Sequence, residues 1–176
     1  MREPVTEERL REFMRAIAAE AREAGRIYIA GGGSAVLEHW RENTVDIDIT
    51  IVPDRDRILR AIPDLKERFH VNVELASPAD FVPPLPGWEE RCRFIVREGL
   101  ISFYHFDFYT QALSKLERAH HKDLLDVESM VRHGFVDPKR LLVMFEEVAG
   151  LLYKYPALNP PTLRAAVERL AAGALQ

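Results

Sequence analysis

The sequence predicts a mixed α/β (α+β) fold with a small mixed sheet, followed by a C-terminal α-helical region. Up to residue 106, apolar runs with strand-like alternation are interleaved with segments whose apolar residues recur at helical spacing. From residue 107 onward, every apolar pattern has helical spacing. We therefore expect an α/β core at residues 1–106 and a helical region at residues 107–176 that packs on this core.

Helices and strands are expected to alternate in the first part of the chain. Thr6 can cap a helix that ends at Gly25. The apolar face of this helix consists of Leu10, Phe13, Met14, Ile17 and Ala21. The next elements are a strand at 26–30, a helix at 34–42, a strand at 45–52, a helical segment at 54–69 and a strand at 71–75. Pro53 is expected to end the second strand, and Pro63 to break the helical segment.

The segment 78–87 is too rich in proline for a regular helix or strand. It is either a rigid connector or a lid across the functional site. After it, strands at 93–96 and 101–106 flank a hairpin turn at Glu98-Gly99. Four helices are then expected at 107–121, 122–133, 137–155 and 160–172.

The third of these helices carries an apolar stripe that needs a partner surface. The stripe consists of Leu141, Leu142, Phe145, Val148, Leu151 and Leu152. The head domain is the first choice for that surface. Dimerisation, or binding of another protein, is the alternative, so the sequence leaves the oligomeric state open.

Composition narrows the classes of function. The 176 residues include 24 Lys and Arg against 28 Asp and Glu, a net charge of −4, so no global basic field attracts nucleic acid. Cys92, the single cysteine, excludes a disulfide framework and a cysteine metal cluster, and we expect it to be buried or half-buried. No apolar run has membrane length and the charged N-terminus has no signal core, which predicts a cytoplasmic protein without a membrane partner.

Two aspartates on the second strand are the strongest functional signal. Asp46 and Asp48 are two residues apart, so they project from the same face of a strand. Val45, Ile47 and Ile49 are expected to face the opposite side, into the core. Neighbouring carboxylates repel each other unless a divalent cation or a shared proton compensates their charge. The pair therefore indicates a metal site.

Three glycines, Gly31 to Gly33, lie between the first strand and the helix that follows. They permit a tight turn and close approach of the backbone to a ligand, and Ser34 can cap the helix. Phosphate oxygens bind at such helix N-termini, so turn and aspartates together indicate a nucleoside triphosphate site. A purely structural turn with a solvated acidic strand is one alternative. A dinucleotide site is another, disfavoured by Val36 and by the early, paired acids.

These residues resemble the nucleotidyltransferase superfamily related to DNA polymerase β. Its signature is an apolar residue, Gly, then Gly or Ser, a spacer, and an apolar-flanked Asp-x-Asp or Asp-x-Glu. Gly33-Ser34 or Gly32-Gly33, followed by 45–49, fits this order. Within the superfamily the chain is most similar to small bacterial proteins of the DUF6036 group and to AbiEii-type toxins, which add a helical segment with a Lys and an acid. Residues 113–118 and 122–126 match that segment, so the resemblance spans about 26 to 131.

The resemblance implies a nucleotidyltransferase fold and roles for individual residues. It assigns metal binding to Asp46 and Asp48, phosphate contact to the turn at Gly32, Gly33 and Ser34, and nucleotide contact to Lys115. The family often has a third carboxylate, and Glu74 on the next strand is the first choice for it. Asp107 is the alternative, and it equally suits the N-cap of a helix.

The implied reaction depends on two Mg²⁺ (or Mn²⁺) ions bridged by the carboxylates. They would activate a hydroxyl for in-line attack on the α-phosphorus and stabilise the departing pyrophosphate. Mg²⁺ prefers a few carboxylates plus phosphate oxygens, so two or three acids suffice. Lys115 near the triphosphate would offset the charge that builds up on the leaving group.

Further polar residues are candidates for the nucleotide pocket. Lys115, Ala119, Lys122 and Asp126 recur at intervals of four, three and four, so they are expected to share one helix face. This face either lines the pocket or is an ordinary solvated surface. Arg41 is either a phosphate ligand or a surface arginine.

Other residues that resemble ligand-binding features have simpler explanations. The adjacent histidines His120 and His121 diverge on a helix and cannot chelate one ion together. The aromatic run at 103–109, Trp40 and Trp88 are expected to pack in the core rather than to stack on bases.

We therefore expect a metal-dependent nucleotidyltransferase that uses a nucleoside triphosphate such as ATP. The acceptor hydroxyl would belong to a tRNA end, a protein or a small molecule. Similarity to AbiEii-type proteins adds the hypothesis of a toxin–antitoxin component with an antitoxin partner, although the sequence itself contains no toxin signal. The alternative is a catalytically silent nucleotide-binding or protein-interaction module that retains the fold.

Overall fold

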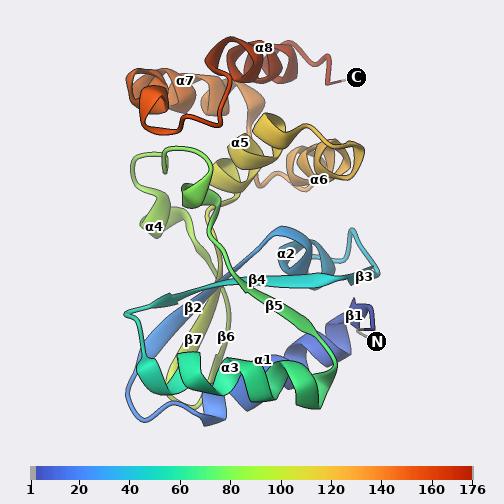
Figure 1. Cartoon of the computed structure of the whole chain (residues 1–176). Coiled ribbons are helices and arrows are strands. Elements are labelled where there is room, and N and C mark those ends of the chain that lie inside the picture. Colours follow the sequence, from blue (N-terminus) through green and yellow to red (C-terminus); the bar gives the residue numbers. More distant parts are fainter. Residues whose placement is uncertain (1–2, 176) are drawn as a thin grey trace. The chain divides into compact units, whose positions relative to one another are not determined.

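The computed structural model describes residues 3–175, which divide into two compact units (Figure 1). The first unit comprises the chain up to Ser77 together with Arg93–His105. The second comprises Pro78–Cys92 and the chain from Phe106 onward. The predicted core at 1–106 included the segment 78–92, which this division places with the helices.

A five-stranded mixed sheet is the centre of the first unit in the described residues. Its strands are β2 (Gly25–Ala30), β4 (Asp46–Val52), β5 (Asn72–Leu75), β6 (Arg93–Glu98) and β7 (Ile101–His105). Their order is β5-β4-β2-β7-β6. Strand β2 is antiparallel to β4 and parallel to β7, β5 is parallel to β4, and β6 and β7 form the predicted hairpin. The sheet confirms the predicted mixed α/β class.

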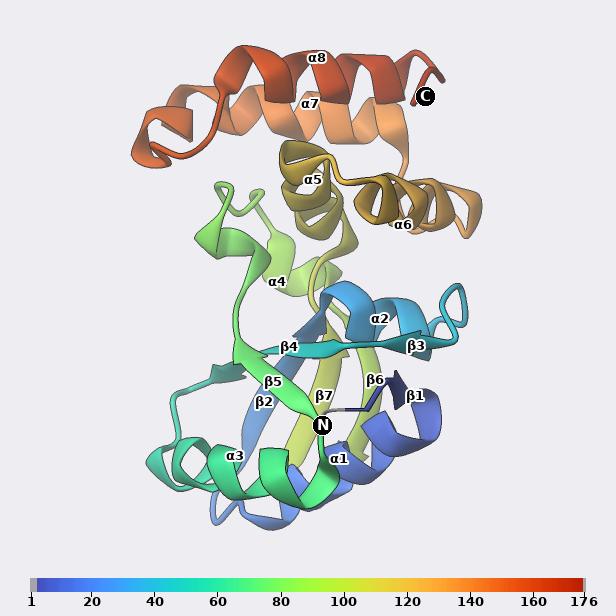
Figure 2. The same cartoon turned by 45° about the vertical axis from the view of Figure 1, so that its right-hand side comes forward.

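Three helices and a small ladder complete this unit in residues 3–77. The helices are α1 (Glu7–Ala19), α2 (Gly31–Leu37) and α3 (Asp56–Phe69), and β1 (Val5–Thr6) pairs with β3 (Asn43–Thr44). Helices α1 and α3 lie on the same side of the sheet (Figure 2). The core between them includes Leu10, Phe13, Ile17, Ile27, Ile29, Ile47, Ile49, Ile58, Ile62, Leu65 and Phe103. The residues that alternate with Ile47 and Ile49 along β4, which include Asp46 and Asp48, therefore lie on the opposite face of the sheet.

Helix α1 has the predicted start but an earlier end. The Thr6 hydroxyl accepts a hydrogen bond from the backbone N–H of Arg9, 3.5 Å away, which confirms Thr6 as the N-cap. The helix ends at Ala19, not at Gly25.

Helix α2 was predicted at 34–42, and this prediction is wrong at both ends. The helix starts directly after β2 at Gly31, so Ser34 lies inside it and Ala30 occupies the N-cap position. It stops at Leu37 because His39 adopts a left-handed backbone conformation with φ 66°. A continuous helix cannot pass through that conformation.

The predicted break at Pro63 does not occur, because α3 is continuous through this residue. Its buried side chains Ile58 and Leu65 hold both halves of the helix on the sheet. Val45 was predicted to face the core, yet 62% of its side chain is exposed. It precedes β4 and lies outside the sheet ladder, whereas Ile47 is fully buried as predicted.

The second unit is helical. Its elements are η1 (Pro78–Asp80), α4 (Trp88–Arg91), α5 (Phe108–Arg118), α6 (His121–Arg132), α7 (Pro138–Val148), η2 (Ala149–Lys154) and α8 (Pro160–Ala171). The four long helices confirm the predicted helical region, while the short η1 and α4 were not predicted. Among residues 3–175, no helix combines the length and the apolarity needed to cross a membrane.

Apolar and aromatic side chains fill the interior of the helical unit. In the predicted stripe, Leu141, Phe145, Val148 and Leu152 are buried, whereas Leu151 is 40% exposed. Trp88 stacks on Phe106 with ring centroids 4.6 Å apart, and Phe108 stacks on Phe135 at 4.7 Å. These four stripe residues are thus buried, Trp88 is half-buried, and α7 packs against α8 of the same unit.

Cys92 is half-buried, as predicted. Its Sγ donates to the carbonyl oxygen of Trp88 at 3.3 Å. Burial raises the pKa of the Cys92 thiol to about 12, so the thiolate is scarce at neutral pH.

Candidate functional site

Asp46 and Asp48 lie on the same face of β4, as their spacing predicted. Both are half-buried, and Ile47 between them points into the core. The parallel pairing with β5 aligns Asp46 with Asn72 and Asp48 with Glu74. Aligned residues of neighbouring strands share a face of the sheet, so three carboxylates and one amide are gathered on one surface.

Asn72 bridges two of these carboxylates. Its Nδ2 donates to Asp46 Oδ1 at 2.6 Å and to Glu74 Oε1 at 3.2 Å. A neutral amide donor thereby offsets part of the repulsion between the two acids. Asn72 was not a predicted site residue. Its position two residues before Glu74 on an alternating strand was the available signal.

The glycine turn lies beside Asp48. Gly31 has φ +60°, and a Cβ on this residue would overlap Asp48 Oδ2. A Cβ on Gly32 would overlap the Thr44 hydroxyl and would lie 3.5 Å from Arg41 Nη1. The bare backbone of Gly31 and Gly32 is therefore in close contact with the Asp48 carboxylate and near the Arg41 guanidinium. Gly31 itself was missing from the predicted site.

Gly33 and Ser34 have internal contacts instead. A Cβ on Gly33 would lie 2.8 Å from Ile29 Cγ2. The Ser34 side chain is fully buried, and its Oγ donates to the Ile29 carbonyl at 2.9 Å and lies 3.0 Å from His105 Nδ1. The predicted helix cap by Ser34 is wrong, because the hydroxyl bonds back to the strand. Phosphate contact by Gly33 and Ser34 stays a prediction.

In the second unit, Lys115 and Asp126 meet in a buried ionic cluster. Lys115 is 4% exposed, and its Nζ donates to Asp126 Oδ2 at 2.6 Å and to Asp123 Oδ1 at 3.3 Å. Arg118 Nη2 donates to Asp123 Oδ1 at 2.7 Å. The cluster joins α5 to α6 and pairs the buried Lys115 ammonium with two carboxylates.

The single helix face predicted for Lys115, Ala119, Lys122 and Asp126 is not formed. Ala119 has a left-handed φ of 55° and ends α5, and α6 starts only at His121. Lys122 is exposed. Lys115 and Asp126 therefore meet across two helices, not along one.

Asp107, the alternative third carboxylate, is the N-cap of α5. Its carboxylate accepts from the backbone N–H groups of Tyr109 and Thr110, both at 3.2 Å. Arg91 donates to the same carboxylate through Nε at 3.0 Å and Nη2 at 2.8 Å. This fully buried group has a structural role, and Glu74 is the acid aligned with the aspartate pair.

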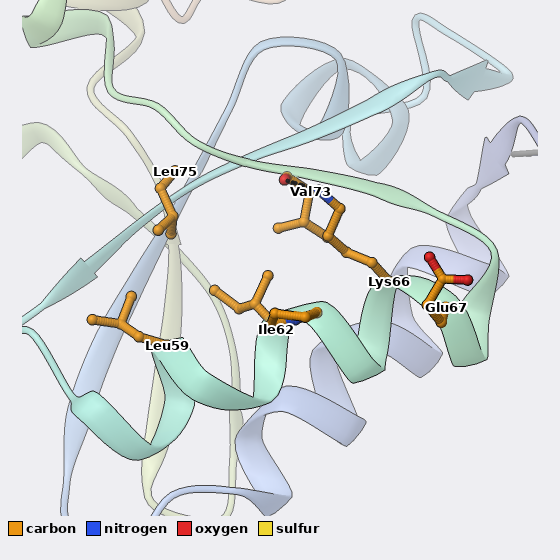
Figure 3. A pocket seen from close by; sticks show the side chains of 7 residues that line it. Leu59, Ile62, Lys66, Glu67, Val73 and Leu75 are labelled. Atoms are coloured by element: carbon orange, nitrogen blue, oxygen red, sulfur yellow. Dashed lines mark hydrogen bonds between the residues drawn. The ribbon is translucent and has the colours of Figure 1, made fainter.

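A cavity of about 540 Å³ lies between α3 and β5 (Figure 3). It is lined by Leu59, Ile62, Pro63, Lys66, Glu67, Val73 and Leu75. Val73 and Leu75 alternate with Asn72 and Glu74, so this mostly apolar cavity is on the face of the sheet opposite the carboxylates. Lys66 Nζ donates to the Val73 carbonyl at 3.3 Å. The cavity is thus separate from the aspartate site.

The chemistry of the donors on β4 fits a magnesium ion. Mg²⁺ binds through one or two carboxylates and completes its shell with water and substrate phosphates. Asp46 and Asp48 supply such a pair, and Asp48 adjoins the bare backbone of Gly31. Within residues 3–175, no group of three or more His, Cys, Asp or Glu side chains is arranged to hold a metal. The metal roles of Asp46, Asp48 and Glu74 stay predictions.

Comparison with known proteins supports the resemblance seen in the sequence. A family model described as "Nucleotidyltransferase of unknown function (DUF6036)" matches residues 8–158. This range contains the glycine turn, the aspartate pair and the Lys115 cluster. The mixed sheet followed by helices is consistent with a nucleotidyltransferase-like fold. No curated protein and no solved structure has a significant match to the chain.

Proposed function

Because the chain belongs to the DUF6036 family of nucleotidyltransferases of unknown function, we propose that it transfers a nucleoside monophosphate from a nucleoside triphosphate, such as ATP, to a hydroxyl acceptor. One observation carries this proposal: Asp46 and Asp48 project from one face of β4, and the Asp48 carboxylate lies against the bare backbone of Gly31. A cation can bind to these carboxylates, and a phosphate that also coordinates the cation can approach the adjacent glycine backbone, which has no side chain in the way.

Asp46 and Asp48 would hold Mg²⁺ or Mn²⁺, with Glu74 as the third acid. When bound, the ion supplies Lewis acidity toward phosphate and activates the acceptor hydroxyl. Asn72 keeps two acids side by side through its hydrogen bonds to Asp46 and Glu74. The chain thereby orients its carboxylates before a ligand arrives, which reduces the ordering that binding would otherwise require.

The nucleotide would be bound by cationic and backbone groups. Gly31 and Gly32 leave room for close approach of phosphate oxygens, and Arg41 brings positive charge near Gly32. For Lys115, Lys122 and Asp126 the family resemblance is the only support. A tRNA end, a protein or a small molecule remains the proposed acceptor, and the antitoxin partner rests on the likeness to AbiEii-type toxins alone.

Pyrophosphate release tests the proposal. The purified chain is incubated with Mg²⁺ and each of the four nucleoside triphosphates, with total tRNA or the chain itself as acceptor. Asp48→Asn should reduce pyrophosphate release by about 100-fold or more, because it removes a charged metal ligand. Asp64→Asn is the matched control, since Asp64 is an exposed aspartate of α3 in the same unit. Unchanged turnover in Asp48→Asn would refute the proposed mechanism.

A catalytically silent nucleotide-binding or protein-interaction module is the second candidate function. It is favoured by the lack, within residues 3–175, of a three-acid group arranged for a metal. Calorimetric titration with the triphosphates detects binding under either function, so the pyrophosphate assay distinguishes the two. The silent module binds a triphosphate or a protein without releasing pyrophosphate, whereas the enzyme does both.

A further inference from the structure

A buried histidine joins both ends of α2 to strand β7, and the proposed reaction does not use it. His105 is 3% exposed and is the last residue of β7. Its Nδ1 lies 3.0 Å from Ser34 Oγ, and its Nε2 lies 2.8 Å from Glu38 Oε1. Ser34 lies in the first turn of α2, and Glu38 is its C-cap residue. One imidazole ring therefore contacts the start and the end of the same helix.

Hydrogen-bond contacts hold both nitrogens of this ring. Ser34 Oγ donates to the carbonyl oxygen of Ile29 and lies 3.0 Å from His105 Nδ1, so one hydroxyl contacts both β2 and β7. The pKa of Glu38 is lowered, chiefly by its hydrogen bond to His105, so the carboxylate is ionised and accepts from Nε2. Burial opposes this shift, while the charges of Arg93 and His39 reinforce it. The ring therefore lies between the Ser34 hydroxyl and the ionised Glu38 carboxylate, within hydrogen-bond distance of both.

Helix α2 depends on such contacts for its position. It spans only Gly31–Leu37, and its N-cap residue Ala30 offers no side-chain acceptor. A helix of this length is not stable by itself, so tertiary contacts decide where it lies. Its first residue, Gly31, is the one whose backbone meets the Asp48 carboxylate. Movement of α2 would therefore move the glycine turn relative to the aspartates.

We propose that His105 is a positioning residue that locks α2 to β2 and β7 through Ser34 and Glu38, and thereby fixes the Gly31-Gly32 backbone beside Asp48. The effect on the helix follows from the fold alone. The consequence for triphosphate affinity rests on the proposed function.

Hydrogen exchange tests the lock without a ligand. His105→Phe keeps an aromatic ring but removes both hydrogen bonds. We expect the amides of residues 34–38 to exchange at least tenfold faster than in the wild type, with α1 and α3 unchanged. Phe103→Leu is the matched control, because Phe103 is a buried residue on the same face of β7 and, unlike His105, has no polar side-chain atom to bond to Ser34 or Glu38. Exchange in α2 that is no faster in His105→Phe than in Phe103→Leu would overturn the proposal.

Glu38→Gln provides a second variant in case the histidine variant does not fold. Glu38 is half-buried, and glutamine keeps an acceptor oxygen while it removes the charge. The same amides should exchange faster, by a smaller factor of about threefold. If exchange in α2 is not selectively faster in Glu38→Gln than in the wild type, the result contradicts the proposed lock.

Titration with ATP and Mg²⁺ then tests the consequence for binding. His105→Phe should weaken the affinity at least tenfold, whereas Phe103→Leu should keep it within twofold. Equal affinity in His105→Phe and wild type would refute the coupling to the turn. If the wild type binds none of the four triphosphates, the proposed function fails, and hydrogen exchange still decides whether His105 locks α2.

Discussion

Replacement of Gly31 by alanine tests the arrangement at the aspartates most directly. Gly31 adopts φ +60°, where a residue with a Cβ is disfavoured by about 1–2 kcal/mol. In addition, the new Cβ would overlap Asp48 Oδ2. The variant must therefore accept backbone strain and move the Asp48 carboxylate out of its present position.

Gly99 provides a control for the backbone strain that alanine introduces at a left-handed position. It has φ +57° in the β6–β7 turn, and a Cβ there would meet no atom of residues 3–175 within 4 Å. Gly99→Ala should thus lower the free energy of unfolding by about 1–2 kcal/mol through strain alone. Gly31→Ala adds about 0.5–1.5 kcal/mol for an off-rotamer Asp48 side chain, for a total of about 1.5–3.5 kcal/mol.

Two measurements decide the matter. Urea unfolding gives the free energies of the two variants, and we expect Gly31→Ala to be the less stable by about 1 kcal/mol. Titration with Mn²⁺ in the presence of ATP should show several-fold weaker binding for Gly31→Ala and unchanged binding for Gly99→Ala. Equal stability together with equal Mn²⁺ affinity would refute the close contact between Gly31 and Asp48 as a determinant of the site.

Two further outcomes concern the ionic contacts of each unit. Asp107→Asn should lower the free energy of unfolding by about 3 kcal/mol, because asparagine can still cap α5 but leaves Arg91 without its buried carboxylate. Asp137→Asn, at the N-cap of α7, changes only the cap and should cost a few tenths of a kcal/mol by urea unfolding. The hydrogen bond from His105 lowers the pKa of Glu38 below its ordinary 4.5, so the stability that Glu38 contributes is complete above that value and is lost as the pH falls through the folded-state pKa. Melting temperatures measured from pH 6 to pH 3 should fall more steeply for the wild type than for Glu38→Gln, and parallel curves would contradict this.

The sequence predicted those features that depend on local periodicity. Alternation along β4 placed Asp46 and Asp48 on one face because successive strand residues point to opposite sides regardless of the rest of the fold. Thr6 was recognised as a cap, because its side-chain acceptor serves N–H groups only a few residues away. Helical spacing likewise predicted the four long helices of the second unit.

Tertiary contacts overrode local rules elsewhere. Pro63 removes one hydrogen bond of α3, yet the buried face of the helix outweighs that loss. Ser34 is a good N-cap residue by type, but its hydroxyl bonds to Ile29 because the helix starts three residues earlier. Helices α2 and α5 end where His39 and Ala119 adopt left-handed conformations. The sequence does not indicate these ends, because only glycine and asparagine are typical of such positions.

The remaining site contacts join residues far apart in the chain. Asn72 meets Asp46 across 26 positions, and His105 meets Ser34 across 71. Neither periodicity nor spacing can indicate such pairs, because strand order and register decide them. Alternation could place Asn72 on the face of Glu74, but its contact with Asp46, like the contact of His105 with Ser34, follows only once β5 and β7 are placed beside β4 and β2.

The buried hydrogen bonds of Ser34 affect how a Ser34 variant with weaker ATP binding must be interpreted. Because the hydroxyl is buried and shared between Ile29 and His105, loss of ATP affinity in Ser34→Ala would first report a displaced α2. Gly31 and Gly32 are the half-exposed members of the turn, whereas Gly33 and Ser34 are buried. The accessible backbone of this turn is therefore that of Gly31 and Gly32. A side chain is disfavoured at these two glycines because its Cβ would overlap Asp48 at Gly31 and Thr44 at Gly32. His105 contacts α2 from the other direction, through the buried Ser34 and through Glu38.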